Sequence, residues 1–214
     1  MRVSANETIN IALRDHQQSI EEWKFSEVAT DLHRWAERMT LEFKLEITVP
    51  PALMLEHLRR RLGHYRRGRN AFGLRDELAI DLEHLQTDSY WQVLGTLLHE
   101  LLHSWQEHNG RPPSLKSHNY HNKELRNKAL SLGLIVDAQG HTQYAPGDTP
   151  FLSILQKYGV EVPEIREMPE PVRVHKGKSK LTLYECPCGV KVRVGRSKFR
   201  AMCLDCDGLF KRGP

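Results

Sequence analysis

Residues 95–106 read GTLLHELLHSWQ, and this stretch decides the fold of the chain. Its leucines, continued by Val93 and Leu94, wrap much of the circumference of a helix, which predicts a deeply buried helix over residues 89–108. Asp88 is the expected N-cap, and Gly110 is expected to end the helix in a left-handed conformation. Ionisable side chains inside such a helix need partners that offset their desolvation.

The ionisable side chains of this stretch are His99, Glu100 and His103, and they fit the pattern H-E-x-x-H. Residues four apart on a helix lie one above the other, so both imidazoles can bind one zinc ion while Glu100 reaches a water on the metal. Zinc activates that water and polarises a carbonyl, and the glutamate transfers the proton to the leaving amine. The pattern predicts a zinc-dependent peptidase with Glu100 as its catalytic residue.

A catalytic zinc takes a third protein ligand, and the sequence offers more than one candidate. His121 stands at the start of the next expected helix, and Glu124 lies close to the spacing of peptidases with a glutamate ligand. His118 is a further histidine, expected in a loop. The metzincin pattern is excluded, because Gln106 and Asn109 occupy its glycine and histidine positions.

The rest of the first 162 residues predicts an α+β domain of helices packed on a small antiparallel sheet. The elements expected before the motif are two helices within 8–43, a strand at 45–49, a helix at 52–62, and antiparallel strands at 62–65, 71–74 and 78–82. The elements expected after it are a helix at 122–132 ending at Gly133, a hairpin at 134–144 and a helix at 149–158. An exposed strand edge near Ala79 and Asp81 would suit pairing with an extended peptide.

All four cysteines lie near the end of the chain, at Cys186, Cys188, Cys203 and Cys206. Two thiolate pairs around the strand-like segment VKVRV predict a structural zinc site in a ribbon at residues 181–214. The first pair has one intervening residue where two are usual. Proline, glycine and charged residues over 163–180 predict an exposed linker between this ribbon and a first domain at 1–162.

Positive charge is concentrated in the same region. Residues 172–214 carry a net charge of +8, which leaves about −4 for residues 1–171. Basic side chains alternate along or follow the expected strand, at Lys191, Arg193, Arg196, Lys198 and Arg200. These side chains predict phosphate contacts, with Phe199 either stacking on a base or packing inside the ribbon. DNA is therefore the expected partner of the ribbon.

The motif GTLLHELLHSWQ followed by NYHNKELRNKALSLGL (residues 119–134) resembles the SprT-like family, which includes the Spartan DNA–protein crosslink proteases. RLGHYRRGRNAFGLRDELAIDL (residues 61–82) is similar to the family's glycine-containing strands before the active-site helix, so the resemblance covers roughly residues 20–160. It implies a minimal-zincin peptidase domain, a C-terminal zinc ribbon and a role in DNA repair on proteins bound to DNA. It also implies that His121 is the third zinc ligand and that Glu124 supports the site.

Composition narrows the class of protein further. No apolar run approaches the roughly 18 residues that cross a bilayer, and residues 1–10 lack the apolar core of a secretory signal. We expect a cytoplasmic protein without membrane association, nucleoid-associated if the source is bacterial, with two zinc ions and a protein or peptide substrate. The alternative function is a nucleic-acid-binding zinc-ribbon protein whose metalloprotease-like domain is a non-proteolytic scaffold.

Overall fold

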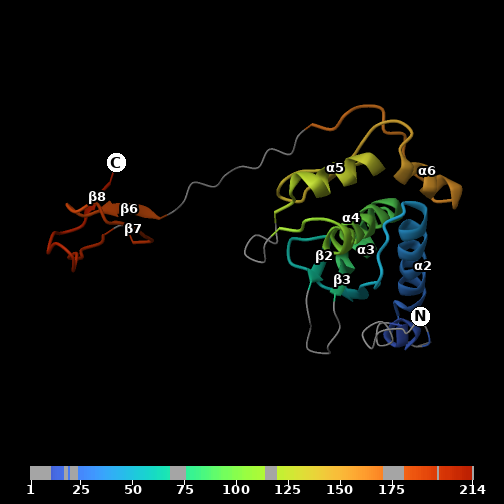
Figure 1. Ribbon diagram of the computed structural model, residues 1–214, viewed down its shortest axis with the longest axis horizontal. Coiled ribbons are helices and arrows are strands. Elements are labelled where there is room, and N and C mark those ends of the chain that lie inside the picture. Colours follow the sequence, from blue (N-terminus) through green and yellow to red (C-terminus); the bar gives the residue numbers. More distant parts are fainter. Residues whose placement is uncertain are drawn as a thin grey trace. The chain divides into compact units, whose positions relative to one another are not determined.

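The structure is a computed structural model that describes residues 11–16, 19, 24–67, 76–113, 120–170, 181–196 and 198–213. The chain forms two compact units, 1–170 and 171–214, and its mixed helices and small sheets make it an α+β protein (Figure 1). The expected strand at 71–74 and His118 lie outside the described residues. No helix in the described part of the chain has the length and apolar character of a bilayer-spanning segment.

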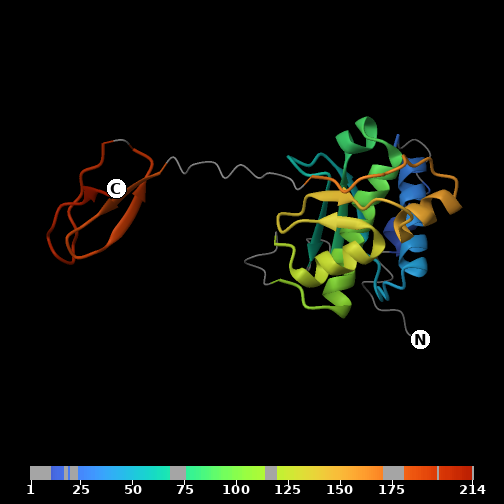
Figure 2. The same ribbon diagram turned by 90° about the horizontal axis from the view of Figure 1, so that it is seen from above.

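The centre of the first unit is helix α4, Tyr90–Asn109, which lies between helix α2 and the sheet (Figure 2). The helix begins with a capping box, in which the backbone N–H of Ser89 donates to Gln92 Oε1 at 3.2 Å. The N-cap is therefore Ser89. The prediction that Asp88 is the N-cap of α4 was wrong, because its carboxylate instead lies 2.7 Å from His84 Nδ1. The prediction of a left-handed conformation at Gly110 was also wrong, because Gly110 has an extended backbone with a φ of −121°.

A three-stranded sheet in the order β1-β3-β2 contains β1 Ala52–Glu56, β2 Gly63–Arg67 and β3 Asp76–Asp81. Strand β1 runs parallel to β3 and β2 runs antiparallel to it, so the sheet is mixed and the expectation of a purely antiparallel sheet was wrong. All six residues of β3 are buried, because both of its neighbours and the helices cover them.

Predictions for residues 45–49 and 52–56 were also wrong. Residues 52–56 form a strand instead of the start of a helix, because pairing with β3 buries Ala52 and Leu53. Residues 45–49 do not form a strand, since Lys44 and Glu46 adopt left-handed φ angles of 48° and 50° that turn the chain. The suggested free edge near Ala79 and Asp81 is wrong too, because β3 is the central strand.

The remaining elements of the first unit pack around α4. They are helices α2 Ser26–Glu42, α3 Leu82–Thr87, α5 Lys123–Leu132 and α6 Pro150–Lys157, and the hairpin of β4 Leu134–Val136 with β5 Thr142–Tyr144. Residues 11–16 are also helical. The helix and hairpin expected after the motif are confirmed, and Gly133 ends α5 with a φ of 101°, as expected.

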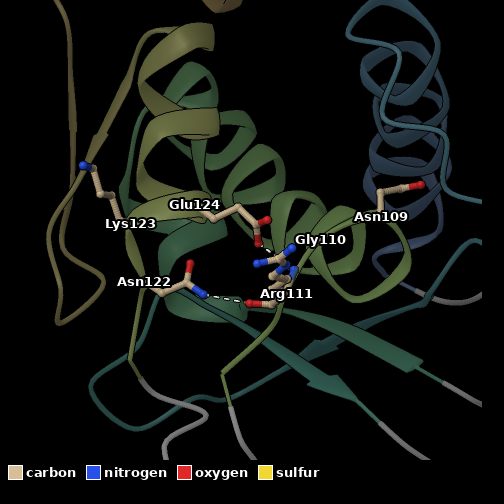
Figure 3. A pocket seen from close by; sticks show the side chains of 6 residues that line it. All are labelled: Asn109, Gly110, Arg111, Asn122, Lys123 and Glu124. Carbon is tan, nitrogen blue, oxygen red and sulfur yellow. Dashed lines mark hydrogen bonds between the residues drawn. The ribbon is translucent and has the colours of Figure 1, made fainter.

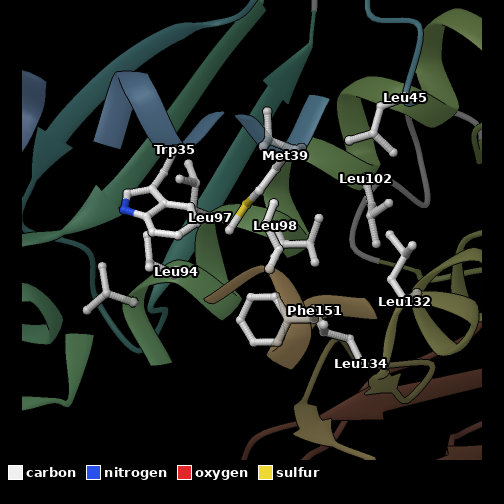
Figure 4. Packing of buried hydrophobic residues seen from close by; sticks show 14 of the residues in the cluster. Trp35, Met39, Leu45, Leu94, Leu97, Leu98, Leu102, Leu132, Leu134 and Phe151 are labelled. Atoms are coloured by element: carbon white, nitrogen blue, oxygen red, sulfur yellow. The ribbon is translucent and has the colours of Figure 1, made fainter. Parts of the chain in front are cut away.

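A large part of the hydrophobic core of this unit lies between α2, α4 and α6. Trp35 and Met39 from α2 lie beside Leu97 and Leu98 from α4, with Phe151 from α6 close by (Figure 4). This packing fixes α4 on several sides. This packing therefore makes α4 a rigid support for the side chains that point away from the core.

The predicted linker began at residue 163, whereas the first unit extends to residue 170. Ile165 packs against the core, and its carbonyl accepts a hydrogen bond from Gly147 N. The second unit contains a three-stranded antiparallel sheet in the order β7-β6-β8, with β6 Thr182–Glu185, β7 Lys191–Val194 and β8 Lys211–Arg212.

Candidate metal centres

Three histidines of the first unit converge on one point. His99 and His103 lie one turn apart on α4, and His121 lies just before α5. Their Nε2 atoms are separated by 2.9 Å (His99 to His121), 3.0 Å (His103 to His121) and 3.2 Å (His99 to His103). The three side chains could therefore hold a metal ion, and His121 is the candidate third ligand that the fold brings to the motif.

The chemistry of this donor set fits zinc. A zinc–nitrogen distance of about 2.0–2.1 Å places tetrahedral ligands about 3.3–3.4 Å apart, close to the observed triangle. Burial, followed by the neighbouring His121, lowers the pKa of His99 to about 3, and burial also holds the pKa of His103 well below its usual value. Both imidazoles are therefore neutral near pH 7, as metal ligands must be.

Other residues orient these imidazoles. His99 Nδ1 lies 2.7 Å from Thr142 Oγ1 on β5, and an Nδ1–H donated there leaves the Nε2 lone pair for a metal. The ring of Tyr65 stacks on His103, with centroids 6.0 Å apart and an interplanar angle of 12°. Sequence reasoning missed Thr142 and Tyr65, because neither lies near the motif in the chain and neither belongs to a recognisable spacing.

Glu100 is buried beside the histidines, with 6% of its surface exposed. Burial raises the pKa of Glu100 to about 8, although the backbone N–H of Tyr65 and the charge of Arg61 act in the opposite direction. Gly63 on β2 makes this position available, because a Cβ there would lie 2.8 Å from Glu100 Oε1. The strand that precedes the motif therefore shapes the surroundings of the carboxyl group.

Glu124, the alternative third ligand, lies elsewhere. Its Oε2 accepts hydrogen bonds from Gln106 Nε2 and from Arg111 N, both at 2.7 Å. It belongs to a pocket of about 660 Å³ at the end of α4, where Asn122 Nδ2 also donates to the carbonyl of Arg111 (Figure 3). Among the described residues, no carboxylate joins the histidine group. Glu124 therefore links α5 to the end of α4.

The four cysteines of the second unit also converge, with all four Sγ atoms within 4.8 Å of one another. Cys186 Sγ lies 2.8 Å from Cys188 Sγ, and Cys188 Sγ lies 3.7 Å from Cys203 Sγ. All four, including Cys206, are free thiols. The short spacing of the first pair is accommodated by a turn in which Gly189 N donates to the carbonyl of Cys186. This group could hold a second metal ion, and four thiolates suit zinc.

The basic side chains of the second unit lie on its surface. Lys191 and Arg193 are exposed on β7 and alternate with half-buried valines. Arg196, Lys198 and Arg200 are also exposed. Lys191 Nζ forms an ion pair with Glu185 at 3.5 Å.

Phe199 packs inside the second unit. Its ring centroid lies 5.0 Å from that of Tyr184 in an edge-to-face arrangement, and 6.2 Å from that of Phe210. Of the two interpretations that the sequence allowed for Phe199, packing is the one observed. Any nucleic-acid contact by this unit therefore depends on its charges rather than on stacking by Phe199.

Trp91 on the motif helix and Tyr120 next to His121 have different surroundings. Trp91 on α4 packs against Tyr144, with centroids 4.5 Å apart, at the edge of the hydrophobic core. Tyr120, which precedes His121, is 48% exposed.

Comparison of the chain with protein-family models, curated proteins and solved structures gives no match.

Proposed function

We propose that the chain is a zinc-dependent endopeptidase of the SprT-like type, with a minimal-zincin domain in residues 1–170. The observation that carries this proposal is the convergence of three histidines beside a buried carboxyl group. His99, His103 and His121 would hold the zinc and leave one position of a tetrahedral ion for a water or substrate oxygen. Glu100 would be the catalytic residue.

Zinc in such a site supplies Lewis-acid polarisation of a carbonyl and an activated water. The protein supplies the proton transfers. Glu100 is buried beside the three histidines, and its carboxylate would take a proton from the attacking water and deliver it to the leaving amine. Gly63 leaves room for this carboxyl group, and the backbone N–H of Tyr65 donates a hydrogen bond to it.

The proposed substrate is a protein associated with or crosslinked to DNA, and the proposed context is DNA repair. The net charge of +8 on residues 172–214 and the exposed Lys191, Arg193, Arg196, Lys198 and Arg200 support binding to phosphates. The first unit is net negative, so its own charge does not favour DNA. The second unit would bring the peptidase to protein that is bound to DNA.

The experiment is cleavage of a basic test protein with and without DNA by the full chain and by Glu100→Gln. The glutamine keeps the volume of the side chain but cannot accept a proton, so we expect zinc to be retained and cleavage to fall by about a thousandfold or more. Glu107→Gln, on the same helix but paired with Arg67 at 2.9 Å, is the matched control and should retain cleavage.

Two outcomes would count against the proposal. Cleavage that persists in Glu100→Gln would contradict the role of Glu100. DNA binding without any cleavage by the unsubstituted, zinc-loaded chain would favour the alternative of a nucleic-acid-binding protein with a non-proteolytic scaffold.

A further inference from the structure

The β4–β5 hairpin contacts α4 and places residues 140 and 142 against the histidine site. Thr142 and Tyr144 share one side of β5, because side chains alternate along a strand, and Gly140 lies in the turn just before it. Gly140 faces the ring of His121, Thr142 contacts His99, and Tyr144 packs against α4 next to Gly95. The turn and the first residue of β5 therefore contact one histidine each, His121 and His99.

The contact between Gly140 and His121 is close. A Cβ on Gly140 would lie 2.5 Å from Cε1 of His121 and 3.0 Å from its Nε2 atom, so the ring occupies the space that any other residue would fill. The backbone of His121 is held by the same hairpin, because its N–H donates to the carbonyl of Ala138 at 3.1 Å. The turn therefore fixes both the backbone and the ring of His121.

The turn itself is rigidly built. Asp137 Oδ1 accepts hydrogen bonds from the backbone N–H groups of Gln139 at 2.8 Å and His141 at 3.0 Å. Gly140 completes it with a φ of 93°, a left-handed conformation that favours glycine. Because these contacts define the turn, a shift at residue 140 would be transmitted to the ring it touches.

The other end of the hairpin is fastened to α4 one helical turn before His99. A Cβ on Gly95 would lie 2.3 Å from the hydroxyl oxygen of Tyr144, so the absence of a side chain at Gly95 lets the tyrosine approach the helix. Tyr144 also packs against the rings of Trp91 and Phe151. This anchor sets the distance at which Thr142 reaches His99 Nδ1.

We infer that the β4–β5 hairpin is the positioning element of the histidine metal site, with Gly140 positioning His121 and Thr142 positioning His99. The inference rests on the proposed function only in taking the three histidines as zinc ligands. It assigns no role in the reaction itself to the hairpin. Its consequence is that zinc affinity depends on residues 140 and 142, which are distant from the H-E-x-x-H motif in the chain.

The first test compares Gly140→Ala with Gly147→Ala in the full chain. Gly147 also has a left-handed φ, 78°, but a Cβ there would meet nothing within 4 Å, so the control carries a similar backbone cost without the collision with His121. Zinc affinity is measured by competition with a chelator, and the four-cysteine site serves as an internal reference. We expect Gly140→Ala to bind zinc at the histidines about 100-fold more weakly and Gly147→Ala to retain the affinity.

The second test keeps the fold intact and removes one hydrogen bond. Thr142→Val has nearly the same shape but no acceptor for His99 Nδ1–H, and we expect zinc affinity to fall about 10–100-fold. Thr142→Ser restores the hydroxyl and should restore most of the affinity. In cobalt-loaded protein, the visible bands of the histidine site should change in Thr142→Val while the thiolate charge-transfer bands stay the same.

The outcomes separate the two proposals. Equal zinc affinity in the unsubstituted chain, Gly140→Ala and Thr142→Val would overturn the positioning role while leaving the peptidase proposal intact. Zinc binding that depends on Gly140 and Thr142, with no proteolysis by the zinc-loaded chain, would overturn the peptidase proposal alone. An unsubstituted chain that binds zinc only at its cysteines would contradict both.

Discussion

The two candidate metal centres are built in opposite ways. The histidine site draws its ligands from α4 and from a segment eighteen residues further on, and a large apolar core holds these elements in place. The cysteine site draws all its ligands from residues 186–206, in a unit whose buried hydrophobic residues, among those described, are Tyr184, Cys186 and Cys203. The fold therefore creates the first site, whereas the metal of the second site would create the fold around it.

The largest expected effect is the loss of the second unit's structure when its metal is removed. Structural zinc contributes about 10–16 kcal/mol in small zinc-binding folds, and the few buried side chains here cannot replace that contribution. Exhaustive chelation of the full chain should therefore expose the second unit to proteolysis while residues 76–113 and 120–170 stay protected. Mass spectrometry of the fragments measures this difference.

A single substitution sharpens the same test. Cys203→Ser removes one buried thiolate and should give the same cleavage pattern without chelation, whereas His121→Ala should leave residues 181–213 protected. A second unit that stays protected after complete metal removal would refute the contrast between the two centres.

The smallest expected effect concerns the charges of the second unit. Arg193 and Arg200 are exposed, so each is expected to neutralise one phosphate. Replacing either with alanine should reduce the slope of log affinity against log salt by about 0.7–0.9. Arg166→Ala is the control, because Arg166 lies in the first unit and pairs with Glu164 at 2.7 Å. Slopes equal to that of the unsubstituted chain would show that these arginines do not contact DNA.

Local patterns predicted the parts of the fold whose causes are local. The leucine spacing of α4, the left-handed Gly133 after α5 and the hairpin after it are all confirmed. Strand β1 was missed because pairing with β3 buries Ala52 and Leu53, which is a tertiary effect that outweighs local preference. The strand expected at 45–49 was wrong because Lys44 and Glu46 turn the chain.

The candidate metal centres also combine features with local causes and features that depend on tertiary packing. His99, Glu100 and His103 follow from a motif, and the gathering of four cysteines follows from their spacing, although binding of zinc at either centre stays a prediction. Thr142 and Gly140 could not be found from the sequence, because only the packing of a hairpin on α4 brings them to the histidines. Long-range contacts of this kind leave no local pattern.

The central claim is that His121, and not Glu124, completes the metal site of the first unit. The most direct measurement is the zinc content of the full chain and of His121→Ala and Glu124→Ala, after equilibration with a chelator of intermediate affinity. We expect two zinc ions per chain in the unsubstituted protein and in Glu124→Ala, and one in His121→Ala. Glu124→Ala should instead lower the free energy of unfolding by about 1–3 kcal/mol, because Gln106 and Arg111 lose their acceptor. Two zinc ions in His121→Ala, or one in Glu124→Ala, would contradict the claim.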